Sequence, residues 1–395
     1  MGLDMPQPAA PLRLRTCLIA AAVAAVTFAG TPAAAEFGVL NDRIVLGQSA
    51  AFKGPAASLG INFRAGLLAA MHEANRAGGV HGRRITLTSY NDGYEPEQAI
   101  ANTIRLIDDD QVFALVGEVG TPTSRSAQPI AEKGGVPFIG PFTGAAFLRD
   151  EALTTVVNVR ASYEQEAEAL VSYLIDHLGL SRIAVLYQDD TFGRSGLAGT
   201  TEALRKRGLE IAVDATYMRN TTAVKRAFLA IRSADPDAVI IVGAYKPAAI
   251  FIKIASNLGL DVVYASLSFV GGEGLAAELG RTDETVIVSQ VVPLFDDLSQ
   301  PLVARFQNAL RASAPEADAG FVALEGYLTG RLVIEALELL GPDPTRSALL
   351  DLFARPLTID VDGMELTFGD GDNQGSDAVF LTTFGADGRF ITVDE

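Results

Sequence analysis

The stretch that decides the fold covers residues 113–147 and reads FALVGEVGTPTSRSAQPIAEKGGVPFIGPFTGAAF. Apolar runs at 113–116 and 136–139 predict two short buried strands, each followed by a Gly-containing turn. Thr121, the predicted N-cap of a helix, follows the first strand, and Thr143 follows the second. Ligands bind where strands end in open α/β sheets, and free amides at a helix start favour a carboxylate. Two ordinary strand-to-helix turns are the alternative interpretation.

Outward from this stretch, strands and helices alternate in both directions. Such alternation predicts parallel sheets covered by helices on both faces. The pattern restarts near residues 158–162, so we predict an α/β fold with two similar doubly wound lobes. The strands are expected at 44–47, 85–87, 113–116, 136–139 and 156–159, and then at 182–187, 211–213, 238–242, 262–265 and 285–291.

The remaining C-terminal part is too short for a third unit. Helices are expected at 301–312, 321–340 and 345–353, followed by strands near Ile359 and Val379 with a Gly/Asp-rich turn between them. We expect this part to complete the two lobes.

The composition limits the classes of partner and chemistry. Apolar residues make up 49% of the chain, which excludes disorder, and the net charge of −17 disfavours nucleic acid and anionic membranes as partners. The chain contains one cysteine, Cys17, so neither an internal disulfide nor a thiolate metal cluster is expected. We expect no cofactor and a monomeric protein.

The first 35 residues are typical of a secretory signal peptide. Arg13 and Arg15 precede an apolar run at 17–29 that is too short to span a bilayer. Small residues follow at 31–35, so cleavage is predicted between Ala35 and Glu36, with export to the periplasm. An uncleaved anchor is the alternative.

Several short motifs occur in a characteristic order along the mature chain. The motifs are Gly54-Pro55, residues 70–82 ending in Gly78-Gly79-Val80-His81-Gly82, Tyr90-Asn91-Asp92, Val116-Gly117, Gly134-Gly135-Val136-Pro137, Asp189 with Phe192-Gly193, residues 235–239 and Gly259-Leu260. In these motifs the chain resembles the type I periplasmic binding proteins of the leucine/isoleucine/valine-binding family, the substrate-capturing subunits of bacterial ABC transporters.

The resemblance implies two lobes joined by three chain crossings, which act as a hinge, with the ligand in the cleft. We place the crossings near Val159, Ser289 and Leu357. The predicted first lobe then comprises residues 36–158 and 290–356, and the second comprises 159–289 and 357–395.

The resemblance also implies which residues contact the ligand. Thr121 matches a hydroxyl residue that holds the ligand carboxylate, and Phe142 with Thr143 or Gly144 matches a segment that holds carboxylate and amine. Phe192 and Tyr245 match aromatic positions of the second lobe, for which core packing is the alternative.

Two positions depart from the family pattern. Leu59 stands where amino-acid-binding members have an aromatic residue, and Ser268 stands where they have a glutamate that pairs with the ligand ammonium. A buried ammonium needs a counter-charge or full hydrogen bonding, which Glu118 or Asp92 would have to supply. The ligand is therefore expected to be a small carboxylate-bearing compound, either an amino acid or a related organic acid.

Other chemistry is weakly supported. We expect structural roles for His72, His81 and His177, none of which falls near a predicted cleft position, so a secreted hydrolase is disfavoured. Residues 370–377 resemble a calcium loop but lack the closing glutamate, which favours a hairpin turn. A periplasmic sensor for a kinase or chemoreceptor is the alternative to delivery to a permease.

Overall fold

The computed structural model describes residues 1–7, 36–385 and 388–393. An N-terminal unit, Met1–Ala35, is separate from the unit formed by the rest of the chain. The predicted apolar signal segment, its two arginines and Ala35 lie outside the described residues, so cleavage after Ala35 stays a prediction. No helix in the described part of the chain is both long and apolar enough to cross a bilayer.

The sheet of the first lobe has five strands in the order β2-β1-β3-β4-β5, all parallel. This arrangement confirms the predicted β-α-β-α-β start. The strands are β1 (Arg43–Ala50), β2 (Arg84–Asn91), β3 (Ala114–Val116), β4 (Phe138–Ile139) and β5 (Val156–Val157).

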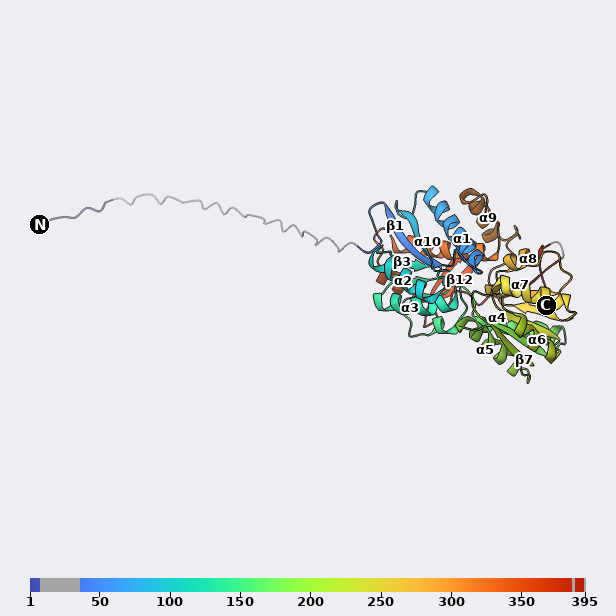
Figure 1. Ribbon diagram of the computed structural model, residues 1–395. Helices are drawn as coiled ribbons and strands as arrows, with labels where there is room; N and C mark the ends of the chain where they lie inside the picture. The colour runs from blue at the N-terminus through green and yellow to red at the C-terminus, as the bar shows by residue number, and fades with distance from the viewer. Residues whose placement is uncertain (8–35, 386–387, 394–395) are drawn as a thin grey trace. The chain divides into compact units, whose positions relative to one another are not determined.

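Helices from two distant parts of the chain cover this sheet. α1 packs closely on α10, and Figure 1 shows them side by side. Glycines permit the contact, since a Cβ at Gly66 would lie 1.9 Å from the Ala323 carbonyl oxygen and one at Gly326 would lie 2.1 Å from that of Phe63. The helices are α1 (Ala57–Arg76), α2 (Pro96–Asp108), α3 (Thr121–Gly134), α9 (Pro301–Ser313), α10 (Phe321–Leu340) and α11 (Arg346–Phe353).

The sheet of the second lobe has seven strands in the order β14-β13-β10-β9-β8-β6-β7. Five strands pair in parallel, but β13 pairs antiparallel with both β10 and β14, so the sheet is not entirely parallel as predicted. β14 begins only a few residues after β13 ends, and so short a connection requires an antiparallel pair. The strands are β6 (Ile183–Gln188), β7 (Val213–Tyr217), β8 (Ala238–Val242), β9 (Val263–Ser266), β10 (Val286–Gln290), β13 (Phe380–Phe384) and β14 (Phe390–Thr392).

The helices of the second lobe follow the predicted pattern. The first of them is α-helical to Ser172 and continues into a π-helical turn, Tyr173–His177. The helices are α4 (Tyr163–Ser172), α5 (Thr191–Arg205), α6 (Lys225–Ala234), α7 (Tyr245–Asn257) and α8 (Gly272–Leu279).

The third chain crossing lies later than predicted. Strands β11 (Leu357–Val361) and β12 (Met364–Phe368) form a hairpin that packs on α10. Asp362, in the turn of this hairpin, accepts a hydrogen bond from Arg305 of α9 at 2.7 Å. Residues 357–368 therefore belong with the first lobe, and the crossing is at 369–379 rather than near Leu357. The Gly/Asp-rich segment is this crossing and not a hairpin turn. The short strand β12 escaped prediction.

The first and third crossings run beside each other. The Asn158 amide donates to the Asn373 carbonyl at 2.7 Å, and the Gly375 amide donates to the Asn158 carbonyl at 2.8 Å. These bonds tie together two of the segments that must move if the lobes rotate.

Candidate ligand-binding site

Two threonines meet where β3 and β4 end. The Oγ1 atoms of Thr121 and Thr143 are 2.7 Å apart, and both residues are fully buried. Thr121 was expected to cap α3, but it is the first helical residue and Gly120 is the N-cap. The Thr121 hydroxyl therefore pairs with Thr143 instead of with a helix amide.

Aromatic rings from both lobes gather beside the threonines. Phe142 follows β4 and Phe192 lies in the first turn of α5. Both contact Phe269, with ring centroids 5.3 and 4.5 Å apart respectively. Tyr94 contacts the same ring at 5.9 Å. Phe142 and Phe192 were predicted from the sequence, whereas Phe269 and Tyr94 were not.

Leu59 and Tyr245 lie at a second contact between the lobes. The Ser58 amide donates to the Tyr245 hydroxyl at 3.4 Å, which joins the start of α1 to the start of α7. Leu59 is buried against Gly271, where an added Cβ would lie 2.5 Å from Leu59 Cδ2. The structure thus places Leu59 at the lobe interface.

Ser268 is buried in a charged network rather than in a solvated loop. Its amide donates to Glu166 Oε2 at 2.8 Å, its hydroxyl donates to Glu166 Oε1 at 3.1 Å, and Arg160 donates to the same hydroxyl. Arg160 also donates to Glu166 Oε1 at 3.0 Å, and Ser289 donates to Oε2 at 2.6 Å. The Glu166 carboxylate is therefore both hydrogen-bonded and neutralised by Arg160.

Glu325 brings a second carboxylate from α10 to the same guanidinium. Its Oε1 is 3.6 Å from Arg160 Nη1. Burial raises the pKa of Glu325 to about 7, although the charge of Arg160 opposes the rise. The network thus joins the first crossing, the second lobe and the first lobe.

Glu118 and Asp92 are the two carboxyls expected to face a ligand ammonium. Both are buried, and Glu118 Oε1 has no hydrogen-bond partner in the described part of the chain. Burial, followed by the charge of Asp92, raises the pKa of Glu118 well above its ordinary value. Burial raises the pKa of Asp92 to about 6, and Asp92 accepts hydrogen bonds from Ser49 and the Tyr94 amide.

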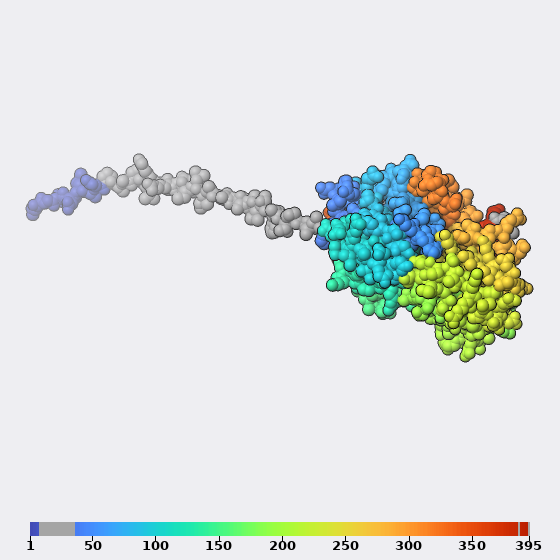
Figure 2. All heavy atoms as spheres, viewed as in Figure 1, coloured from blue at the N-terminus to red at the C-terminus, as the bar shows by residue number. Residues whose placement is uncertain are grey.

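A further set of polar contacts crosses between the lobes. Arg219 donates to Glu95 Oε2 at 2.8 Å, and Asn220 donates to Glu95 Oε1 at 2.7 Å and to the Gly93 carbonyl at 3.0 Å. Figure 2 shows atoms of the first lobe, in blue to cyan, adjoining those of the second lobe, in green to yellow.

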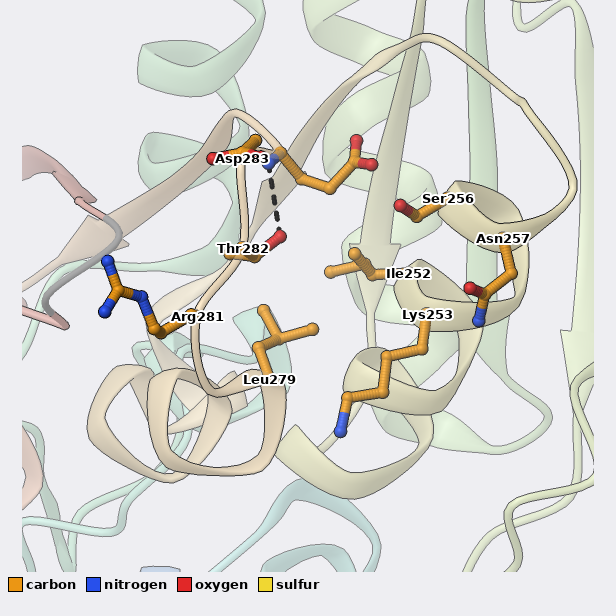
Figure 3. A pocket seen from close by; sticks show the side chains of 9 residues that line it. Ile252, Lys253, Ser256, Asn257, Leu279, Arg281, Thr282 and Asp283 are labelled. Atoms are coloured by element: carbon orange, nitrogen blue, oxygen red, sulfur yellow. Dashed lines mark hydrogen bonds between the residues drawn. The ribbon is translucent and has the colours of Figure 1, made fainter.

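A separate hollow of about 750 Å³ lies between α7 and the segment that follows α8. Figure 3 shows Lys253 and Ser256 on one side and Arg281 and Thr282 on the other. None of the eight predicted ligand-contacting residues lines it. This hollow is a distinct location from the site predicted by the sequence.

The remaining candidates have contacts elsewhere. His81 lies 3.4 Å from Glu338, and His177 stacks on Tyr173 at 4.9 Å. In the predicted calcium-like loop, Asp377 accepts from Gln165 at 2.8 Å. Within the described ranges, no group of three or more His, Cys, Asp or Glu side chains is suited to hold a metal ion.

Two α/β lobes that contact each other through polar side chains, such as Arg160 with Glu325 and Arg219 with Glu95, have the architecture of a bilobal binding protein. A family model described as periplasmic binding protein matches residues 43–389, and the chain belongs to this family. The family consists of solute-binding proteins and not of enzymes.

Relatives and solved structures agree with this assignment. Leu/Ile/Val-binding protein homolog 7 of Brucella abortus is 26% identical over 398 residues, covering 95% of this chain and 96% of that protein. The leucine-, isoleucine-, valine-, threonine-, and alanine-binding protein of Pseudomonas aeruginosa is 23% identical over 315 residues, covering 80% and 83%. The crystal structure of a possible leucine/isoleucine/valine-binding protein from Rhodopirellula baltica matches with a TM-score of 0.85 and 35% identity, covering 89% and 96%. The predicted family and fold are confirmed.

Proposed function

We propose that the protein captures a small carboxylate-bearing ligand between its lobes in the periplasm and delivers it to the membrane subunits of an ABC permease. The observation that carries the proposal is the buried Thr121–Thr143 hydroxyl pair at the ends of adjacent parallel strands. Two hydroxyl donors there, beside the first turn of α3, suit a carboxylate.

The apolar side of the ligand is proposed to lie against the aromatic rings. Phe142 and Phe192 come from different lobes and share Phe269 as a neighbour. A ligand that contacts both rings must bridge the lobes. Such a ligand favours the closed arrangement of the lobes because it contacts both of them at once only in that arrangement. The crossings can absorb the backbone rotation that closure needs.

We further propose that the ligand needs no α-ammonium. Glu166 accepts hydrogen bonds from Ser268, the position expected to lie near a ligand ammonium, but its charge is already paired with Arg160. Burial, followed by the charge of Asp92, raises the pKa of Glu118 and so disfavours the charged form that would pair with an ammonium. A buried ammonium without a charged partner is costly, so acids without that group are expected to bind at least as well as leucine or valine.

Two measurements test this proposal. Mass spectrometry of ligand that remains bound through purification should identify a small carboxylic acid. A thermal-shift panel should then compare leucine, valine and phenylalanine with 4-methyl-2-oxopentanoate, 3-methyl-2-oxobutanoate and phenylpyruvate. Clear preference for the amino acids would mean that Glu118 or Asp92 pairs with the ammonium, and a Glu118→Gln variant would then lose that preference.

Export and delivery are tested separately. N-terminal sequencing of periplasmic material should give Glu36 as the first residue, and retention of Met1 in the membrane fraction would contradict export. The ligand-loaded monomer should bind permease subunits in a pull-down from membranes. Recovery of a sensor kinase or chemoreceptor in their place would favour a sensory role.

A further inference from the structure

Tyr163 lies among the predicted ligand-contacting residues, although the sequence did not single it out. It is the first residue of α4, whose N-terminus is fixed by a capping box between Ser162 and Gln165. The Tyr163 amide donates to the Gly144 carbonyl at 2.7 Å, and the ring is fully buried. The start of the second lobe is thereby held against the loop that follows β4.

The position of the ring explains the glycine at 144. A Cβ there would lie 2.7 Å from both the Cδ1 atom and the backbone nitrogen of Tyr163, so only glycine permits this approach. On its other side the ring lies 5.4 Å from that of Phe192. Tyr163 therefore contacts predicted site residues of both lobes.

The Tyr163 hydroxyl is buried and has no hydrogen-bond partner within the described residues. Burial raises the pKa of Tyr163, while the charge of Arg160 and then the hydroxyls of Thr143 and Thr121 oppose that rise. The phenol hydroxyl thus lies near the threonine pair. A buried donor without an acceptor is unfavourable, and a carboxylate has enough lone pairs to accept from all three hydroxyls.

We propose that Tyr163 is a ligand-binding residue whose hydroxyl donates a hydrogen bond to the ligand carboxylate beside Thr121 and Thr143. This inference rests on the proposed function, because it needs a carboxylate at the threonine pair. Tyr163 begins α4 of the second lobe, whereas both threonines belong to the first. The carboxylate is then held by both lobes, so recognition of the acid itself favours closure.

The test is Tyr163→Phe, which removes only the hydroxyl. Isothermal calorimetry uses the acid that binds the wild-type protein most tightly among 4-methyl-2-oxopentanoate, phenylpyruvate and leucine. The variant should bind about tenfold to a hundredfold more weakly, as expected for loss of one charge-assisted hydrogen bond. The Tm of the unliganded variant should equal or exceed that of the wild type, because the lost hydroxyl has no protein partner.

Tyr264→Phe is the matched control. The Tyr264 hydroxyl, on β9, is also buried without a partner, so its loss should leave both affinity and Tm nearly unchanged. Three results would overturn the role of Tyr163 and leave the proposed function standing. They are an unchanged affinity in Tyr163→Phe, equal losses of affinity in the two variants, and a Tm of unliganded Tyr163→Phe below that of the wild type. A wild-type protein that binds none of the three probes would overturn the proposed function and, with it, the role of Tyr163.

Discussion

The side-chain oxygens of Thr121 and Thr143 lie 2.7 Å apart, although 22 positions separate the two residues in the chain. Strands β3 and β4 bring them together, since the carboxyl ends of adjacent parallel strands lie at one edge of the sheet. Each hydroxyl now bonds to the other. A carboxylate between them would exchange that neutral bond for two charge-assisted ones, which are about twice as strong.

Replacement of Thr121 by alanine should therefore weaken ligand binding. The loss of one charge-assisted hydrogen bond predicts an affinity about tenfold to a hundredfold lower. The bond to Thr143 is also lost, which should lower the free energy of unfolding by about 1 kcal/mol. Calorimetry with the tightest-binding acid and urea unfolding measure the two effects.

Thr200→Ala is the control for this prediction. Thr200 is a buried threonine on α5 whose hydroxyl has no hydrogen-bond partner among the described residues, so the change deletes the same atoms away from the threonine pair. Its affinity should match that of the wild type. If Thr121→Ala also binds normally, the carboxylate lies elsewhere.

The threonine pair could be predicted because its signals are local. Short apolar runs and Gly-rich turns place both residues at strand ends, and the parallel pairing of β3 with β4 brings those ends together. Arg160, Tyr163 and Phe269 could not be found this way, because their places in the site depend on contacts with the other lobe. Those contacts are with Glu325, Gly144 and Phe142 respectively. The third crossing was misplaced because β12 is only five residues long and follows β11 after a two-residue turn.

The contact of Glu95 with Arg219 should favour the closed arrangement of the lobes. Glu95→Gln removes the ion pair and should reduce the affinity for the tightest-binding acid by a factor of about 1.4 to 5, since partly exposed pairs contribute about 0.2–1 kcal/mol. Salt screens such pairs, so the difference from the wild type should shrink in 1 M NaCl. Calorimetry at low and high salt measures both effects.

Glu202→Gln provides the comparison for this ion pair. Glu202 pairs with Arg205 at 2.7 Å within α5, so its loss changes no contact between the lobes. Affinity in that variant should be unchanged at every salt concentration. Equal affinities of Glu95→Gln and wild type at low salt would show that the Glu95 contact does not stabilise closure.

Glu325 predicts a pH dependence of stability. Its pKa of about 7 in the folded protein exceeds the ordinary value of 4.5, so the folded state binds the proton more tightly. Protonation of Glu325 therefore stabilises the folded state. This stabilisation is fully present below about pH 4.5 and is lost as the pH rises through about 7. Urea unfolding should show that the free energy of unfolding of the wild type is lower at pH 8 than at pH 5. In Glu325→Gln this decrease should be smaller by about 1–3 kcal/mol. An identical pH dependence in both proteins would contradict the buried, protonated carboxyl.

The most direct measurement is the crystal structure of the protein with the acid that it binds most tightly. The account predicts that the carboxylate oxygens lie within hydrogen-bonding distance of the Thr121 and Thr143 hydroxyls, between the two lobes. A carboxylate bound in the hollow beside Lys253 and Arg281, or one left in solvent, would contradict it.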